Sequence, residues 1–343
     1  AGIGAYFIFQ KSAFPESEIH CPEDTKVCPD GSVVGRIPPD CEFGSCPKDL
    51  SKTEKKTSDN TPQWSQFGYD GGNSGRSPFI GPKTNKLKWK FQDGKTACNY
   101  ETVMTSPVLD SKANLYFGTS EGSLIALSPE GKEIWRFTIP DAYSRDNCGS
   151  SMYAPRELYD LNIDYTPAID NGTIYFGTSG QENAKKIYAV DSNGKLKWTY
   201  AIDSALQSDI KLGYNQRIYF TTKTKLYSLD KTGKDIKTYP VKVKSNTPAI
   251  AKDGTIHVCS GEGLIALDED LRHKWTYQTK SELKHCDPAI NPDTGTIYFP
   301  VNGEYKLYAV NPDGTLKWKA DIFWAESSPS VAKDGTIYIG TAN

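Results

Sequence analysis

Cysteines are the residues of this 343-residue chain whose number and spacing most clearly indicate chemistry. Half of them lie close together, and the full set of eight is Cys21, Cys28, Cys41, Cys46, Cys98, Cys148, Cys259 and Cys286. An even number of cysteines, crowded in one short segment, is typical of disulfide bonds formed in an oxidising compartment. Zinc is the alternative for the first four. They contain no C-x-x-C pair, however, so their spacing favours disulfides.

Few other residues have the spacing of a metal or catalytic site. No two of the histidines stand at metal-ligand spacing: His20, His257, His273 and His285. Segments such as "AKDGT" and "NPDGT" place Asp beside Gly, which suits tight turns better than a calcium loop. No nucleophile-elbow, phosphate-loop or zinc-protease motif occurs. The sequence therefore predicts no cofactor, metal or catalytic residue, although an enzyme site assembled from separate segments would escape this search.

A repeating pattern from residue 61 to residue 343 must position these residues. Six segments share an anchor position, which is proline in all but one copy: Pro107, Pro167, Ile210, Pro248, Pro288 and Pro329. Most anchors are followed by a turn and three apolar runs, as in "NLYFGTS", "LIALS" and "EIWRF". Four short strands repeated about every 40 residues are the signature of a β-propeller blade.

The last copy, residues 327–343, supplies only two strands. A last-strand sequence without preceding strands, residues 86–91, lies upstream of the first copy. We expect it to complete the sixth blade, because pairing the two parts of the chain removes open sheet edges. The prediction is an all-β fold, a six-bladed β-propeller of four-stranded antiparallel blades closed by N- and C-terminal strands. The third strand of the last blade stays unassigned: either that blade has three strands, or the chain is cut short.

Tryptophan recurs at one place in the last strand of most copies, which predicts packing between blades: Trp89, Trp135, Trp198, Trp275 and Trp318. With "TIYFGTS", "LYAVN" and the lead-in "WSQFGYDGGNSGRSPFIGP", this pattern resembles the pyrroloquinoline-quinone-like, or tryptophan-motif, propeller repeat. The resemblance implies one of two kinds of protein. One is a quinone-dependent dehydrogenase with eight blades and calcium. The other is a non-catalytic scaffold, such as the propeller lipoprotein of the outer-membrane barrel-assembly machinery.

The scaffold branch is favoured, because this chain has fewer repeats than the enzymes, no adjacent Cys-Cys pair and no acidic cluster. No quinone ligand is therefore assigned.

Candidate binding residues lie in the loops before each first strand, which should emerge on one face of the ring. Two of these loops, 92–105 and 139–166, are enlarged and rich in polar and aromatic residues, as binding loops often are. The alternative is that the loops only plug the channel mouth. We expect one disulfide between Cys98 and Cys148 and another between Cys259 and Cys286. The candidates for binding are Tyr100, Glu101, Tyr143, Arg145, Tyr153, Arg156, Tyr159, Tyr165, His285, Trp324 and Glu326.

The chain is expected to have four parts. Residues 1–11 are apolar and are interpreted as the end of a membrane anchor or signal segment, with a buried strand as the alternative. Residues 12–47 form a disulfide-rich module that resembles short cysteine-rich modules beside membrane anchors in exported bacterial proteins. Residues 48–62 are a polar linker, and residues 63–343 form the propeller.

These features predict an extracytoplasmic, membrane-anchored protein in the periplasm or at the cell surface. Its expected role is a non-catalytic binding scaffold for a protein or cell-envelope polymer. One alternative is a quinone- or calcium-dependent oxidoreductase, or a hydrolase, acting on the same face. Another is a subunit of a self-assembling surface structure that associates by strand exchange. The formal net charge of −2 gives no reason to expect nucleic acid as a partner.

Overall fold

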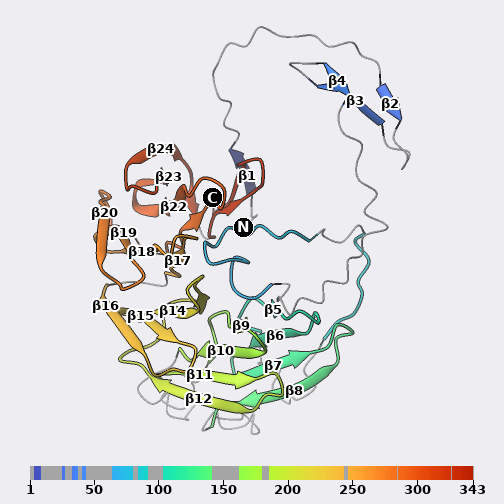
Figure 1. Ribbon diagram of the computed structural model, residues 1–343, viewed down its shortest axis with the longest axis vertical. Coiled ribbons are helices and arrows are strands. Elements are labelled where there is room, and N and C mark those ends of the chain that lie inside the picture. The colour runs from blue at the N-terminus through green and yellow to red at the C-terminus, as the bar shows by residue number, and fades with distance from the viewer. Residues whose placement is uncertain are drawn as a thin grey trace. The chain divides into compact units, whose positions relative to one another are not determined.

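The computed structural model describes residues 4–8, 25–27, 33–37, 41–43, 64–79, 84–91, 103–140, 162–179, 185–242, 246–283, 285–325 and 327–342. The chain divides into two compact units, one of Ala1–Ile8 with Asn60–Asn343 and one of Phe9–Asp59. Strands make up nearly all the regular structure in these ranges, with one short 3-10 helix, η3 (Asn302–Glu304) (Figure 1). No helix in the described ranges is long and apolar enough to span a membrane. The protein is all-β, as its sequence predicts.

The smaller unit contains one antiparallel sheet of three strands, β2 (Thr25–Val27), β3 (Val33–Ile37) and β4 (Glu42–Phe43). Cys41, just before β4, is disulfide-bonded. Cys21, Cys28 and Cys46 lie outside the described residues, so the pairing of cysteines within this module stays a prediction.

Within its described residues, the larger unit contains six four-stranded antiparallel sheets. Five of them have their strands in consecutive chain order, the order expected for propeller blades. Their strands are β5 (Val108–Leu109), β6 (Leu115–Gly118), β7 (Ser123–Leu127), β8 (Glu133–Thr138); β9 (Ala168–Asp170), β10 (Thr173–Gly177), β11 (Lys186–Asp191), β12 (Leu196–Ala201); β13 (Lys211–Leu212), β14 (Arg217–Thr221), β15 (Lys225–Asp230), β16 (Ile236–Pro240); β17 (Ala249–Ile250), β18 (Ile256–Ser260), β19 (Gly263–Leu267), β20 (His273–Tyr277); β21 (Ala289–Ile290), β22 (Ile297–Val301), β23 (Lys306–Val310) and β24 (Leu316–Asp321).

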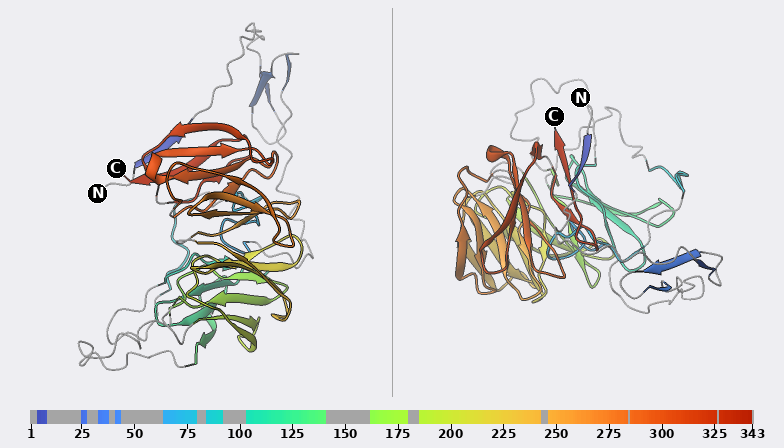
Figure 2. Two further views of the ribbon diagram at one scale, coloured as in Figure 1. Left: turned by 90° about the vertical axis from the view of Figure 1, so that its left-hand side faces the viewer. Right: turned by 90° about the horizontal axis from the view of Figure 1, so that it is seen from above.

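Burial along these strands explains why they form. The second and third strands of each sheet are apolar runs, and every residue of β7 and β10 is buried. Such runs are typical of strands covered on both faces, here by the neighbouring sheets. The outer strands are instead half-exposed, and in β12 exposed residues alternate with partly buried ones. Figure 2 shows the successive sheets from two further directions.

The tryptophans pack between sheets, as predicted. Four of the five indole nitrogens donate a hydrogen bond to a carbonyl in a tight turn of the next sheet: Trp89 to Pro129, Trp135 to Ser192, Trp198 to Lys231 and Trp275 to Pro312, at 2.8–3.1 Å. Trp318 packs against the core of the fifth and sixth sheets. In the four hydrogen-bonded contacts, the indole ring lies over a glycine of the turn. A Cβ atom on Gly194 would come within 2.8 Å of the Trp135 ring. The Gly-bearing turn and the tryptophan therefore form one contact that joins successive sheets.

The sixth sheet is assembled differently from the other five. It contains β26 (Ser330–Val331), β27 (Ile337–Ala342), β1 (Gly4–Ile8) and β25 (Trp324–Ala325). Strand β1 pairs with β27 in antiparallel register, from Ile8 opposite Ile337 to Gly4 opposite Thr341. It therefore takes the third-strand place that the sequence left unassigned. This agrees with the alternative interpretation of residues 1–11 as a strand, and membrane anchoring stays a prediction.

The expectation that residues 86–91 supply a strand of the sixth sheet was wrong. Residues 84–91 form no strand. Side chains hold this segment instead, because Trp89 and Phe91 pack against the first sheet at Phe117, Ile125 and Leu127. The N-terminal strand that pairs with the C-terminal one is β1.

A single segment, residues 64–74, touches all six sheets, and we call it the hub segment. It accepts a hydrogen bond from the residue two places after each anchor, and all these bonds are 2.7 or 2.8 Å long. The pairs, in chain order, are Leu109 with Trp64, Ile169 with Ser65, Leu212 with the Gln66 side chain, Ile250 with Gly71, Ile290 with Gly72, and Val331 with Ser74. Consecutive parts of one short segment thus fix the innermost strands in turn.

Candidate functional site

The residue just before each anchor is a serine, threonine or aspartate, and we call these six residues the belt: Ser106, Thr166, Asp209, Thr247, Asp287 and Ser328. Because they share one repeat position, they lie at the same end of the innermost strands. The loops that connect one sheet to the next, and the second strand of a sheet to the third, also lie at this end. We call this end the loop face and the opposite end the turn face.

Hydrogen bonds join most of the belt. The Thr166 amide donates to Asp209 Oδ1 at 2.6 Å, and Asp209 Oδ2 accepts from Thr247 Oγ1 at 3.0 Å. The Thr247 amide then donates to Asp287 Oδ1 at 2.5 Å. Ser328 Oγ donates to Asp287 Oδ2 at 3.0 Å. The carboxylates of Asp209 and Asp287 thereby connect the second, third, fourth, fifth and sixth sheets.

A cavity of about 550 Å³ lies where three belt residues, Ser106, Asp287 and Ser328, come together, and we call it the belt pocket. The hub segment contributes Trp64, Phe67 and Asn73 to its lining, and residues near the sixth sheet contribute further serines. The other lining residues are Gly68, Gly75, His285, Ser327, Pro329 and Ser330. The belt pocket is thus lined by hydroxyl groups, one carboxylate and two aromatic side chains.

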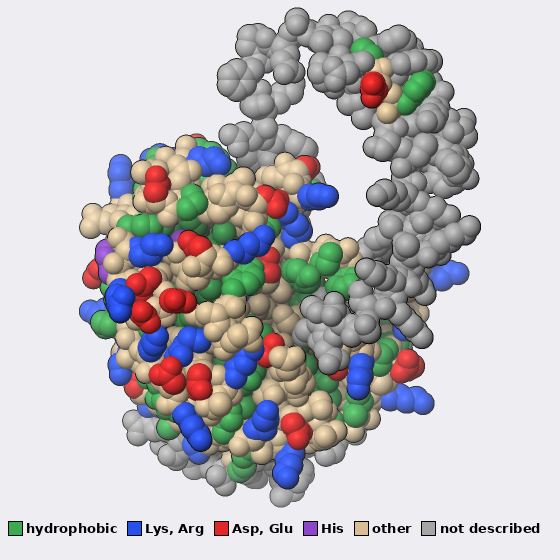
Figure 3. Space-filling model, in the orientation of Figure 1, with side chains coloured by type: hydrophobic (Ala, Val, Ile, Leu, Met, Phe, Trp, Pro, Cys, Tyr) green, Lys and Arg blue, Asp and Glu red, His purple; other side chains and the backbone are tan. Residues whose placement is uncertain are grey.

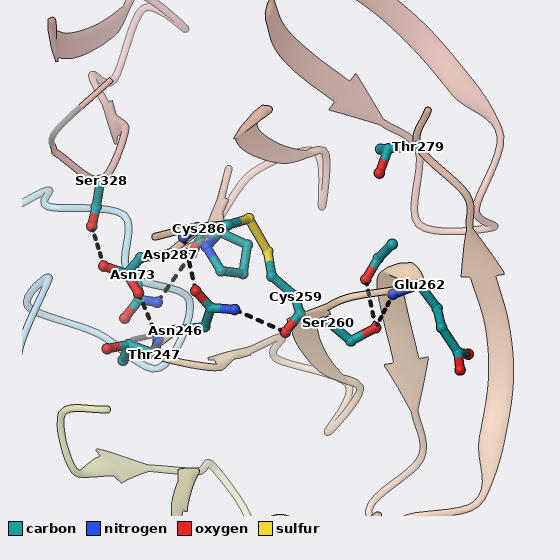
Figure 4. Close-up of a disulfide and its surroundings, with 12 residues drawn as sticks. Asn73, Asn246, Thr247, Cys259, Ser260, Glu262, Thr279, Cys286, Asp287 and Ser328 are labelled. Carbon is teal, nitrogen blue, oxygen red and sulfur yellow. Dashed lines mark hydrogen bonds between the residues drawn. A yellow bond between two sulfur atoms is a disulfide. The ribbon is translucent and has the colours of Figure 1, made fainter. Parts of the chain in front are cut away.

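A disulfide bond lies beside Asp287, which lines this pocket; Figure 4 shows the bond and its surroundings. Cys259 at the end of β18 is bonded to Cys286, next to Asp287, and their Cα atoms are 6.0 Å apart. The Asn246 side chain connects the two, since it donates to the Cys259 carbonyl at 3.1 Å and accepts from the Cys286 amide at 2.9 Å. The expected Cys259–Cys286 bond is therefore present. Cys98 and Cys148 lie outside the described residues.

Burial changes the ionisation of charged groups around the hub segment and the belt. Burial raises the pKa of Asp287 to about 6, although the Thr247 and Ser328 hydrogen bonds act in the opposite direction. Burial also raises the pKa of Asp209. Lys211 is fully buried, and its Nζ donates to the Phe67 and Asp70 carbonyls at 2.6 and 2.8 Å. Burial lowers the pKa of this amine to about 7, against the attraction of three nearby aspartates.

Three of the predicted binding residues lie in the described ranges. Tyr165 is partly buried and packs against the core of the second and third sheets, which makes it a packing residue here. His285 is exposed, has a φ angle of 52° and lines the belt pocket. Trp324 belongs to β25 and is 43% exposed. The other candidates lie outside the described residues: Tyr100, Glu101, Tyr143, Arg145, Tyr153, Arg156, Tyr159 and Glu326.

Trp324 has two exposed aromatic neighbours, and we call Tyr305, Phe323 and Trp324 the aromatic edge. Tyr305 is 57% and Phe323 52% exposed. The backbone beneath them is fixed, because the Ile322 amide donates to the Tyr305 carbonyl at 2.9 Å. The Asn302 side chain also both donates to and accepts from the Ala325 backbone, at 3.0 and 2.8 Å. Both segments belong to the loop face.

Sequence reasoning missed the belt and the hub segment. The belt left a readable signal, because a small hydroxyl or carboxyl residue precedes the anchor in all six copies. The hub segment left a weaker one. Its glycines and serines resemble an ordinary loop, and its contacts depend on how six sheets come to lie beside it.

The described residues do not supply the ligands that a calcium–quinone pair would need. Within the described ranges, no three His, Cys, Asp or Glu side chains converge as metal ligands. Of the two belt carboxylates, only Asp287 lines the belt pocket. We derive no chemical step through such a group, and the lack of a cofactor stays a prediction.

Comparisons with known proteins agree with the propeller fold. No curated protein sequence matches this chain. A quinohemoprotein alcohol dehydrogenase from Pseudomonas putida HK5 superimposes with a TM-score of 0.50 at 14% identity, over 70% of this chain and 55% of that one. BamB from Moraxella catarrhalis has a TM-score of 0.45 at 15% identity, over 71% and 86%. A streptogramin B lyase has 0.49 at 15%, over 69% and 78%. At such identities the likeness concerns the fold alone.

A family model covers the later sheets. Residues 183–341 match the model described as outer membrane protein assembly factor BamB. This range begins just before β11 and ends within β27, so it includes the tryptophans and Gly-bearing turns that join these sheets. The match covers less than half of the chain, and within it the repeats are similar to those of the pyrroloquinoline-quinone-like propeller family.

Proposed function

We propose that this protein is a non-catalytic binding scaffold whose loop face holds a protein partner. The observation that carries the proposal is the aromatic edge, three large side chains exposed on a firmly held backbone. Tyrosine and tryptophan are enriched among the residues that contribute most to protein–protein binding. Side chains on a fixed backbone also lose less conformational entropy when a partner binds. The aromatic edge therefore has the composition and the rigidity of an anchor for a partner.

The charge distribution agrees with a partner recognised by shape and local contacts. On the face drawn in Figure 3, basic and acidic side chains are interspersed, and neither sign dominates a large area. A protein that binds a polyanion usually presents a coherent basic surface. A protein partner suits this face better than a strongly charged polymer.

We also infer that the protein works outside the cytoplasm. The disulfide between Cys259 and Cys286 suits an oxidising compartment. The family model carries the name of an outer membrane assembly factor, which supports the same location. A membrane tether through residues 1–11 would require β1 to leave its pairing with β27, and it stays a separate prediction. It is tested by fractionating cells that express the chain with and without those residues.

Site-specific photo-crosslinking tests the scaffold function. A benzophenone amino acid would replace Trp324 on the loop face or, as the matched control, Tyr214, which is 46% exposed on a turn of the turn face. We expect irradiation of cell envelopes to yield a discrete crosslinked protein from position 324 and none from position 214. Equal crosslinking yields at the two positions would contradict the proposal. The absence of a crosslink at both positions would contradict it too.

Alanine substitutions supply an independent test. The double variant Phe323→Ala, Trp324→Ala should weaken partner binding at least tenfold, because it removes two exposed aromatic side chains. Its thermal unfolding should match that of the wild type, since both side chains are about half exposed. Unchanged binding by a folded double variant would place the partner surface elsewhere.

A further inference from the structure

The belt pocket contains a carboxylate and several other hydrogen-bond acceptors, but no described lysine or arginine lines it. The carboxylate is that of Asp287. His285 is the other titratable group in this lining, and it is exposed at the surface. Lys211, a buried cation that interacts with Asp287, also interacts with Asp70 and Asp209 and does not line the pocket. The Asp287 carboxylate is therefore only partly compensated, and it attracts a further cation more strongly where water is partly excluded.

The Asp287 carboxylate retains acceptor capacity toward the pocket. Its two oxygens accept from the Thr247 amide and the Ser328 hydroxyl. An ionised carboxylate offers about four acceptor positions. The side chain is partly exposed and lines the cavity, so a ligand can reach it. Asp209 holds the equivalent repeat position but does not line the pocket. It therefore serves as a matched comparison.

Asn73 adds to the negative potential of the pocket. It lines the cavity and is 1% exposed. Its Nδ2 donates to the Pro248 and Pro288 carbonyls at 3.3 and 3.0 Å, which fixes the orientation of the amide. Its Oδ1 has no hydrogen-bond partner among the described residues. A fixed, unpaired carbonyl dipole on a buried side chain favours positive charge nearby.

The remaining lining suits a flat cation better than a compact one. Trp64 and Phe67 place aromatic surface in the pocket, and four serines also line it: Ser106, Ser327, Ser328 and Ser330. A guanidinium group is planar, stacks on aromatic rings and donates five hydrogen bonds in fixed directions. An ammonium group is more strongly hydrated and gains less from the aromatic wall.

We propose that the belt pocket binds an arginine side chain presented by the protein partner. The inference rests on the proposed scaffold function, and it specifies the side chain that the partner would place in the belt pocket. Asp287 provides the counter-charge, the serine hydroxyls accept the outer N–H groups, and the aromatic side chains cover the guanidinium plane. The disulfide beside Asp287 and the two hydrogen bonds that Asp287 accepts, from the Thr247 amide and the Ser328 hydroxyl, hold the carboxylate in place before the partner arrives.

Small probes test the pocket directly. N-acetyl-arginine amide would be titrated into the full chain at pH 7.5 and followed by ligand-observed NMR and calorimetry. N-acetyl-citrulline amide, its uncharged isostere, serves as the control ligand. We expect the citrulline and lysine analogues to bind at least tenfold more weakly than the arginine probe. Equal affinity of the citrulline probe would overturn the role of charge, and equal affinity of the lysine probe would overturn the preference for arginine.

Matched variants locate the site. Asp287→Asn should weaken binding of the arginine probe at least tenfold, whereas Asp209→Asn should leave it within about twofold. Ser106→Trp gives a second test that spares the belt carboxylates, because its bulk should block the exposed rim of the pocket. Loss of binding in Asp209→Asn to the same extent as in Asp287→Asn would overturn the proposal. So would stronger binding of methyl β-glucoside than of the arginine probe, which would indicate a polyol site.

The two proposals fail separately. If the arginine probe does not bind while position 324 still crosslinks a partner, the pocket inference is wrong and the scaffold function stands. If the probe binds while no partner crosslinks from the aromatic edge, the scaffold function fails at its own site.

Discussion

At the scale of single residues, His257 departs from the repeat. The equivalent position is tyrosine in the other sheets, and Tyr116, for example, donates to Asp110 Oδ2 in the adjacent turn at 2.9 Å. His257 is 2% exposed and lies opposite Ala249 in the sheet, yet neither ring nitrogen has a hydrogen bond of normal geometry. A cavity of about 230 Å³ opens beside it on the turn face. The shorter side chain therefore leaves space and unsatisfied polar atoms.

We predict that His257→Tyr raises the free energy of unfolding by about 1 kcal/mol, because it fills space and removes buried unpaired nitrogens. The pH dependence should change too. Burial lowers the pKa of folded His257 to about 4, below the usual value of about 6.5. Between pH 4 and pH 6.5 His257 is protonated more in the unfolded chain than in the folded one. The free energy of unfolding of the wild type therefore falls as the pH drops through this range, and the tyrosine variant should not show this fall. Urea unfolding at pH 5 and pH 7.5 measures both effects, and a less stable variant at pH 7.5 would contradict the argument.

At the scale of elements, the turn glycine and the tryptophan form the contact between successive sheets. Gly194 has a φ angle of 78°, and a Cβ there would meet the Trp135 ring at 2.8 Å. Gly335 has a similar φ of 86° but nothing within 4 Å of its Cβ position. The two glycines share the same backbone requirement and differ in packing.

Alanine substitutions at these two positions separate the backbone from the packing contribution. Gly335→Ala should cost about 1 kcal/mol, from the left-handed backbone alone. Gly194→Ala should cost about 1–3 kcal/mol more, because the tryptophan must move from its position. Chemical denaturation of both variants measures the difference. Equal destabilisation would mean that the tryptophan contact does not resist displacement.

At the scale of the whole molecule, the hub segment ties six sheets to one another. Lys211, in strand β13 of the third sheet, stabilises the hub segment by donating to the Phe67 and Asp70 carbonyls. Because the amine is fully buried, its contribution depends on its charge state. The hub segment is therefore a place where local substitutions should affect the stability of the entire ring.

We predict that Lys211→Met lowers the free energy of unfolding by about 1–3 kcal/mol at pH 7.5, because two buried carbonyls lose their donor. Burial lowers the pKa of folded Lys211 to about 7, whereas the unfolded value is about 10.4. In this range the unfolded chain binds more protons, so wild-type stability gains with rising pH, and the variant lacks that gain. The difference between the two should widen from pH 7 to pH 9.5. Lys237→Met, at an exposed ion pair with Asp270, is the control and should change little. A difference that narrows with pH would contradict the buried amine's role.

The sequence by itself determined the strand repeats, the packing of the tryptophans and the Cys259–Cys286 bond. These features follow from local patterns, because apolar runs, Gly-bearing turns and a tryptophan at a fixed offset dictate the same unit each time. Equivalent positions in neighbouring units must then meet. The belt could also have been predicted from the sequence, since Asp209 and Asp287 occupy the same repeat position.

Only the tertiary structure decided the rest. The pairing of β1 with β27, the path of the hub segment and the belt pocket each join residues that are far apart in the sequence. No local pattern specifies such contacts, because they depend on how the sheets assemble in three dimensions. Ser65 and Gln66 have no repeat of their own. Their partners exist only once the inner strands of six sheets lie beside one segment, and that arrangement is a property of the assembled sheets.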